Sequence, residues 1–283
     1  MSQKIKLAQS RTQGEVVDDS VIFLKQNIFP LLKSYFSICG IFWVAGIIIS
    51  ILSKTQTFEL QQQEESIYTV TYFVTLLFSY INFTLGMLTS LSYIKFYLDK
   101  GNQPPTVQEV WDYVKYYFLK VFGSAIVLTL FTALGAFMCF IPGIYLLPVN
   151  LLIITVMVME NESLSNAFRR GFQLIKNEWW NLMGVLLVTS IVTISCMALL
   201  VIPVVLVVVA LLYLTNVNHS NTVSMAATVT YHALQFLFVF PAISLALFYF
   251  NLNEKLDDNG LMQRIAALGT KQESNDEPTT EDY

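Results

Sequence analysis

The sequence predicts an all-α integral membrane protein with six transmembrane helices and three amphipathic helices at the cytoplasmic membrane interface. Of its 283 residues, 55% are hydrophobic and only 13% are charged, whereas soluble domains carry about 25% charged residues. Several apolar runs reach the roughly 20 residues that a helix needs to cross a bilayer. Basic and aromatic amphipathic segments precede some of these runs. We therefore expect one membrane domain over residues 15–265, between a flexible N-terminus (1–14) and a disordered acidic tail (266–283).

The first unit combines an amphipathic segment with two apolar runs. Its apolar residues recur at helical spacing and are Val17, Val21, Leu24 and Ile28. Pro30 should bend or end this segment, because proline lacks a backbone donor. Spans are expected over about residues 35–53 and 68–98, joined by a polar loop. The second run is longer than a bilayer requires, so this span should tilt or protrude.

A second amphipathic helix follows the breaker sequence DKGNQPP. Thr106 and Glu109 can form a capping box at its start, and Trp111 lies on its apolar stripe. Residues 118–159 must then hold the third and fourth spans around Pro142. That length is barely enough for two crossings of about 20 residues each. A shallow re-entrant hairpin is the alternative.

The third amphipathic helix has the clearest pattern. Its apolar residues follow the spacing i, i+3, i+4, i+7, i+8 and i+11, and they are Leu164, Ala167, Phe168, Gly171, Phe172 and Ile175. Aromatic residues on one face and basic residues on the other suit a helix in the plane of a membrane interface, and Trp prefers the headgroup level. A surface helix of a soluble domain is the alternative. The predicted interface residues of the chain are Trp111, Phe168, Arg169, Arg170, Phe172, Lys176, Trp179 and Trp180.

The apolar run after Trp179 continues as far as Leu214, which is too long for one straight crossing. We expect one span with a kink near Pro203 and an extension beyond it. The last span should cover about residues 226–252.

Basic residues assign the two sides of the membrane. With six spans, all but Lys54 of the 16 Lys and Arg residues fall on one side. The positive-inside rule then places both termini and all three amphipathic helices in the cytoplasm, as in a protein of a bacterial-type inner membrane. Splitting the run at Pro203 into two spans would move the last three basic residues outside, so we disfavour seven spans.

The order of elements suggests a three-fold internal repeat over about residues 15–100, 105–160 and 161–253. Residues 24–32 align with residues 174–182, with Leu, Asn and Leu in common. The even-numbered spans each end at an acidic or amide residue, namely Asp99, Glu160 and Asn253. Each repeat would consist of an interfacial helix, a span, a loop and a second span.

Several motifs resemble the membrane domain attached to some glycerophosphoryl diester phosphodiesterases, which also has stand-alone bacterial relatives. They are Pro142-Gly143-Ile144-Tyr145, Glu162, Ala167 to Arg170, Lys176 to Trp180, and Phe248-Tyr249-Phe250 with the segment 254–260. The resemblance covers roughly residues 15–265. The catalytic TIM barrel of those enzymes has no counterpart here, so the resemblance implies a membrane module without the enzyme.

The sequence contains few candidates for chemistry. It has no HExxH, CxxC, Gly-rich phosphate loop or supported Ser/His/Asp grouping, and we expect neither metal nor cofactor. The candidate polar residues within spans are Asn82, Asn150, His232 and Gln235. Ionisable residues at depth can mark function, but we interpret His232 as a hydrogen-bonded structural residue that shares a helical face with Gln235.

These observations favour a non-catalytic multi-pass membrane module that acts as a scaffold or associates with lipids. Membrane lipids are its expected partners, the basic helices also suit a cytoplasmic or membrane protein, and no basic tract suggests nucleic acid. A transporter of a small or lipid-like substrate is the second interpretation, since Pro148, Pro203 and Pro241 could break helices. An intramembrane hydrolase comes third, because paired carboxylates and metal-ligand spacing are missing.

Overall fold

The computed structural model describes residues 9–59, 65–138, 140–215 and 220–273, and every regular element among them is helical. In chain order these elements are α1 (Gln13–Glu59), α2 (Glu65–Asp99), α3 (Val107–Met138), α4 (Phe140–Glu160), α5 (Leu164–Ile175), α6 (Trp179–Thr215), α7 (Ser220–Ala233), the 3₁₀ helix η1 (Gln235–Phe238) and α8 (Val239–Glu273). Within these residues, six helical segments are long and apolar enough to cross a membrane. The chain is therefore a multi-pass, all-helical membrane protein.

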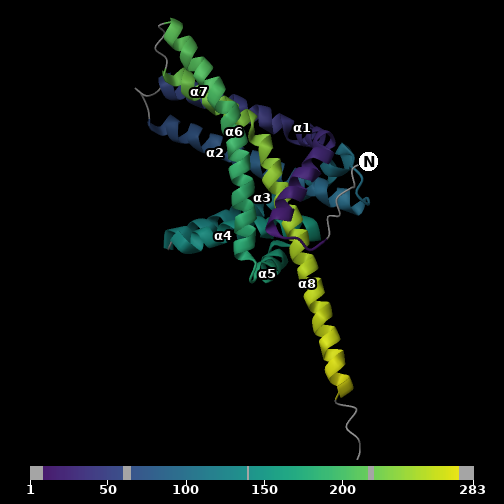
Figure 1. The fold of residues 1–283 in the computed structure, drawn as a ribbon. Helices are drawn as coiled ribbons and strands as arrows, with labels where there is room; N and C mark the ends of the chain where they lie inside the picture. Colours follow the sequence, from purple (N-terminus) through teal and green to yellow (C-terminus); the bar gives the residue numbers. More distant parts are fainter. Residues whose placement is uncertain (1–8, 60–64, 139, 216–219, 274–283) are drawn as a thin grey trace, which may run out of the picture.

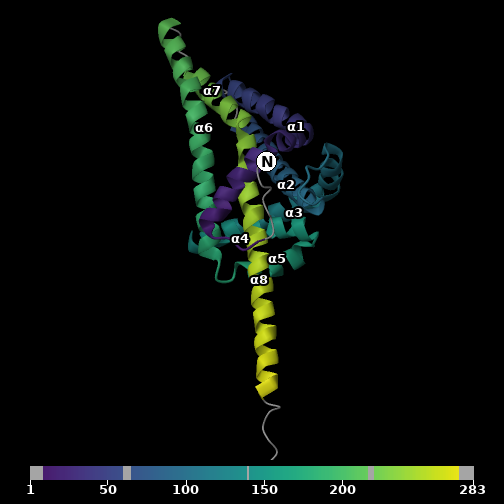
Figure 2. The ribbon, with the colours of Figure 1, turned by 45° about the vertical axis from the view of Figure 1, so that its right-hand side comes forward.

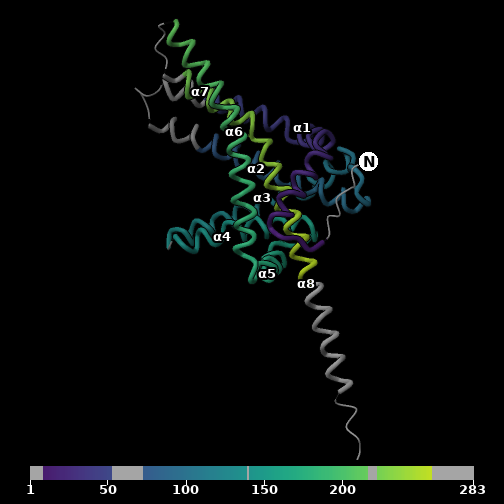
Figure 3. The backbone as a smooth tube through the Cα atoms, in the orientation of Figure 1, coloured from purple at the N-terminus to yellow at the C-terminus, as the bar shows by residue number. Residues whose placement is uncertain are grey.

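The helices pack mainly as neighbours in the chain. α1 packs on α2, α3 on α4, and α6 on α7, while α8 contacts α1, α2, α4 and α6. Figure 2 shows the first half of α8 between α6 on one side and α1 and α2 on the other, and α8 contacts all three helices. In Figure 1 the second half of α8 extends away from the other helices. Figure 3 shows α7 running back from the far end of α6 toward the start of α8.

Helix α8 and helix α6 differ sharply in how much of their surface is buried. Almost every side chain of α8 from Val239 to Leu252 is buried, whereas α6 exposes most of its apolar residues, including Tyr213 at 83%. Such an apolar surface would be unfavourable in water but not against lipid chains. α8 is thus the core of the membrane domain, and α6 presents its long apolar face outward.

Two of the three amphipathic segments are not separate helices. α1 continues through Pro30 and includes both the first amphipathic segment and the first span, and α3 does the same for the second unit. The predicted capping box is present at the start of α3, where Glu109 Oε2 accepts from the Thr106 backbone N–H at 2.7 Å. The amphipathic segments of α1 and α3 therefore extend directly into the apolar parts of the same helices.

The buried face of α1 differs from the predicted stripe. Val16, Phe23 and Leu31 are buried together with Ser20 and Asn27, whereas Ile28 is exposed. Ser20 donates to the Val16 carbonyl and Asn27 to the Phe23 carbonyl. Because these polar side chains bond to their own helix, they can be buried without an unmet hydrogen bond.

The final apolar segment is broken. α7 ends at Ala233, η1 follows, and α8 begins at Val239, so His232 and Gln235 do not share one helical face as predicted. The proline at position 241 has no N–H for the carbonyl of Leu237 and its ring crowds that carbonyl, which favours a 3₁₀ turn one turn earlier. By contrast, α6 is continuous through Pro203, which disagrees with splitting that run into two spans.

The ends of the predicted domain also differ from expectation. α8 extends to Glu273, so part of the predicted 266–283 tail is helical, and residues 274–283 lie outside the described residues. At the other end, α1 begins at Gln13 and Arg11 is fixed against the bundle. Residues 1–8 and the loop residues 60–64 lie outside the described residues.

Candidate functional site

Helix α5 docks on the protein through the predicted apolar face. Ser163 caps it by accepting from the Asn166 N–H at 3.4 Å. Ala167, Gly171 and Leu174 are fully buried in this interface. A Cβ atom at Gly171 would lie 2.8 Å from Ile153 Cγ1, so glycine lets α5 approach α4 closely. Protein contacts therefore cover much of the apolar face.

A polar clamp holds α4, α5 and α8 together beside this helix. Glu160 Oε1 accepts from the Tyr249 hydroxyl at 2.9 Å and from Arg170 Nε at 3.3 Å. The same guanidinium donates to Asn253 Oδ1 at 2.9 Å. Of the predicted interface cations, Arg170 is thus half-buried and structural, whereas Arg169 and Lys176 are exposed.

The two tryptophans at the start of α6 differ in role. Trp179 Nε1 donates to the Tyr145 carbonyl at 3.0 Å, and its ring stacks on the Tyr145 ring. Trp180 is 79% exposed. The contact with Tyr145 places the corner between α5 and α6 against the first turns of α4, close to the tip of the α3–α4 hairpin.

Each of the three units carries exposed basic residues together with exposed aromatic or large apolar residues. We call these surfaces the basic–aromatic strips. Their exposed members are Lys25, Phe29, Lys33 and Phe36 on α1, Trp111, Lys115, Tyr116, Leu119 and Lys120 on α3, and Arg169, Lys176 and Trp180 at α5 and α6. Phe29 is 84% exposed between two lysines. Phe168 and Phe172, which were also predicted at the interface, are half-buried against the core.

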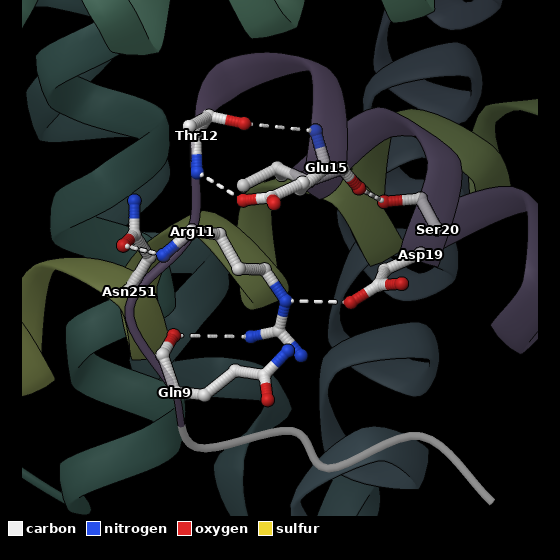
Figure 4. Close-up of polar contacts among 8 residues, drawn as sticks. Gln9, Arg11, Thr12, Glu15, Asp19, Ser20 and Asn251 are labelled. Carbon is white, nitrogen blue, oxygen red and sulfur yellow. Dashed lines mark hydrogen bonds and ion pairs between the residues drawn. The ribbon is translucent and has the colours of Figure 1, made fainter. Parts of the chain in front are cut away.

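The start of the chain is anchored to the end of the bundle (Figure 4). The Arg11 side chain is 0% exposed; its Nε donates to Asp19 Oδ2 and its backbone N–H donates to Asn251 Oδ1, both at 2.7 Å. Thr12 and Glu15 form a second capping box at the start of α1. The buried Arg11 side chain thus joins this N-terminal segment to α1, and the Arg11 backbone N–H joins it to α8.

The same end of the bundle holds a polar cleft of about 480 Å³ between this segment, α6 and α8. Gln13 donates to Asn181, and Glu178 accepts from Asn181 at 2.6 Å and from Lys255 at 2.9 Å. Burial raises the pKa of Glu178, but these two hydrogen bonds and the Lys255 charge lower it further, so the net pKa lies below its usual value. Since these polar groups bind one another, the cleft is a structural junction.

Lys95, in α2, caps the C-terminal end of α4. Its ammonium donates to the carbonyls of Val158 and Met159, each at 3.0 Å, and to the Tyr113 hydroxyl at 3.1 Å. The last carbonyls of a helix have no intrahelical partner and carry the negative end of its dipole. Lys95 therefore fastens α2 to the end of α4. This role was not predicted from the sequence.

Two predicted intramembrane residues, Asn82 and Gln235, line the same cavity, which is partly open at the surface of the bundle. It has a volume of about 350 Å³ and lies between α1, α2, α7, η1 and α8. Asn82 donates to the Phe42 carbonyl at 3.0 Å. The break in the final segment brings Gln235 and Phe238 to its wall, as expected for irregular backbone inside a membrane, which is tolerated where it lines a cavity.

Asn150 lies at an adjoining cavity of about 470 Å³ between α2, α3 and α4. The two cavities share Tyr80, Phe83 and Met87 in their walls. Asn150 donates to the Leu128 carbonyl at 2.9 Å and to Thr132. The structure thus places three of the four candidates around two neighbouring cavities.

His232 is not among the residues that line either cavity. Its Nε2 lies 3.1 Å from Ser50 Oγ and its Nδ1 2.9 Å from the Thr228 carbonyl. Its own carbonyl accepts from Trp43 Nε1 at 3.1 Å. These contacts join α7 to α1. Across the described ranges, no three His, Cys, Asp or Glu side chains are placed to hold a metal ion together.

No family model, curated protein or solved structure matches this chain. The resemblance to the phosphodiesterase membrane domain therefore stays a prediction.

Proposed function

We propose that this chain is a non-catalytic, lipid-associated membrane module whose three basic–aromatic strips lie at the cytoplasmic interface of an inner membrane. The strips carry the proposal. Large exposed aromatic rings between lysines are unfavourable in water, whereas at the headgroup level rings and cations both find suitable surroundings. The same placement would put both termini in the cytoplasm. It also leaves the strips available to a protein partner at the membrane surface.

The α3–α4 hairpin is re-entrant in this proposal and does not cross the bilayer fully. Lys176 and Glu178 must stay near water, so Trp179 lies within about one turn of the interface. Tyr145 contacts Trp179 and therefore lies near that level. The tip at Phe140 is only about 8 Å further along α4, at ~1.5 Å per residue, whereas the bilayer core is about 30 Å thick.

The composition of the tip agrees with this placement. Phe137 is 91% exposed, and Met138, Phe140 and Ile141 are also highly exposed. A spin label at position 137, with native cysteines replaced, should report low water access and a depth within the lipid chains. A spin label at position 213, at the far end of α6, gives the reference values of water access and depth with which position 137 is compared. High water access at position 137 would show instead that the hairpin crosses.

Lipid retention tests the function itself. Arg169 and Lys176 are exposed, and each basic residue near an anionic leaflet contributes about 1 kcal/mol. Arg169→Gln with Lys176→Gln should therefore weaken binding to phosphatidylglycerol by up to about 30-fold. Lys54→Gln, on the predicted opposite side, is the control. Native mass spectrometry of protein released from phosphatidylglycerol and phosphatidylcholine nanodiscs measures the retained lipids. Equal retention of phosphatidylglycerol by the Arg169→Gln/Lys176→Gln variant and by Lys54→Gln would contradict the proposal.

The break between α7 and α8 favours transport of a lipid-like substrate as a second candidate. Discontinuous helices beside a cavity are typical of transporters. Movement of fluorescent lipid between leaflets of proteoliposomes tests it. Transport predicts that the lipid moves between leaflets faster in proteoliposomes than in protein-free vesicles. Equal rates would exclude this transport and favour a module that only binds lipid.

A further inference from the structure

The cavity at Asn82 and Gln235 contains polar groups without partners. The side chains of Tyr35, Ser79 and Gln235 make no hydrogen bond to the described part of the protein, and all three line this cavity. Tyr35 is buried, and Ser79 and Gln235 are half-buried. A polar group without a partner is costly inside a membrane. The cavity therefore suits an occupant that can hydrogen-bond.

The walls indicate the charge of this occupant. Among the described residues, those that line the two adjoining cavities include no Asp, Glu, Lys, Arg or His. A phosphate, carboxylate or ammonium group would enter without a counter-charge, which is strongly unfavourable at low dielectric. Hydroxyl, ester and amide groups can instead bond to a phenol, a serine and two side-chain amides. The polar part of the occupant should therefore be neutral.

The second cavity suits a hydrocarbon chain. Its walls are mainly Ala, Val, Leu and Ile side chains of α3 and α4. Several of its polar side chains bond within the protein: Thr129 pairs with the Tyr80 hydroxyl at 2.9 Å, and Asn150 and Thr132 donate to the Leu128 carbonyl. Asn150 Oδ1, by contrast, is buried with no hydrogen-bond partner among the described residues. Both volumes fall in the range of about 300–1,000 Å³ that is usual for ligand pockets.

We propose that the two adjoining cavities form one binding site for a neutral amphiphile with a hydroxyl or ester headgroup, such as a diacylglycerol. The headgroup lies among Tyr35, Ser79, Asn82 and Gln235, and a hydrocarbon chain passes Tyr80 and Phe83 into the space between α2, α3 and α4. This site is separate from the basic–aromatic strips, so it extends the proposed function and does not depend on it.

Photolabelling of the full-length protein in nanodiscs tests the site. The probe is a diacylglycerol with a diazirine in one acyl chain, and the reference is phosphatidic acid with the same chains. Ala133→Phe places a ring in the chain cavity, and Val127→Phe places the same ring on the exposed face of α3 as the matched control. Gln235→Leu removes a headgroup partner without removing a protein hydrogen bond.

If the site exists, the diazirine diacylglycerol probe should label the cavity walls in α2 and α3, and an excess of diacylglycerol without a diazirine should reduce this labelling. The phosphatidic acid probe should label the same walls far less. Ala133→Phe should abolish this labelling, Val127→Phe should preserve it, and Gln235→Leu should lower it about five-fold, as expected for one hydrogen bond. Equal labelling by both probes, or labelling that neither Ala133→Phe nor Gln235→Leu changes, would overturn the proposal. Phosphatidylglycerol retention by the strips should be the same in all three variants, which separates a failure of this site from a failure of the interfacial function.

Discussion

Leu174 provides the sharpest test of how α5 is held in place. This side chain is 2% exposed in the interface of α5 with the bundle. Leu→Ala at a buried site costs about 2–5 kcal/mol, and we take about 2 kcal/mol because this helix lies at the edge of the bundle. That cost should raise the undocked population about 30-fold. Arg169→Ala, on the exposed face, should change it by less than about three-fold.

Hydrogen exchange of the α5 amides in nanodiscs measures this opening. If protein contacts hold the helix, Leu174→Ala should lose protection about 30-fold whether or not anionic lipid is present. Replacing the half-buried Phe168 and Phe172 by Asp should also loosen the helix, because their rings pack on the same core. Unchanged protection in Leu174→Ala, combined with loss of protection when anionic lipid is removed, would show that lipid holds α5 and would refute this reasoning.

Two further predictions concern the polar fastenings of the bundle. Lys95→Met should lower stability by about 2 kcal/mol, because two helix-end carbonyls lose a charged donor; thermal unfolding followed by tryptophan fluorescence measures it, and an unchanged midpoint would contradict the role of Lys95. The pKa of Glu178 is lowered in the folded protein, so its stabilising effect is present above its ordinary pKa near 4.5 and is lost as the pH falls through the lowered value. In Glu178→Gln the unfolding midpoint should therefore fall less at low pH than in the wild-type protein. If the midpoint depends on pH identically in both proteins, Glu178 does not contribute this pH-dependent stability.

Short-range patterns were the most predictable part of the fold. The apolar runs correspond to long helices, and the Thr106–Glu109 capping box is present because it depends on residues only three apart. The buried stripe of α1 could not be read from apolar spacing, because Ser20 and Asn27 are buried through bonds to their own helix. The position of Arg11 depends on Asn251 at the other end of the chain, and no local pattern reports such a contact.

The candidate site was partly predictable for a similar reason. Asn82, Asn150 and Gln235 were identified because they are polar within apolar runs, and the structure places them around two neighbouring cavities. Their grouping depends on the break before α8, which Pro241 explains only once the η1 turn is known. An interfacial position of Trp179 stays a prediction from the preference of tryptophan for the headgroup level. Its contact with Tyr145 joins segments that the sequence alone could not pair.

Membrane topology tests the central claim most directly, because the proposed function requires all three basic–aromatic strips on the cytoplasmic side. A reporter fusion after Gly101 ends just before the second strip, and one after Asn177 ends within the third strip, after Arg169 and Lys176. A fusion near Gln62, which lies outside the described residues, follows the first span. The account predicts cytoplasmic activity at Gly101 and Asn177 and external activity at Gln62. An external reporter at Asn177 would place the third strip on the wrong side of the membrane and contradict the account.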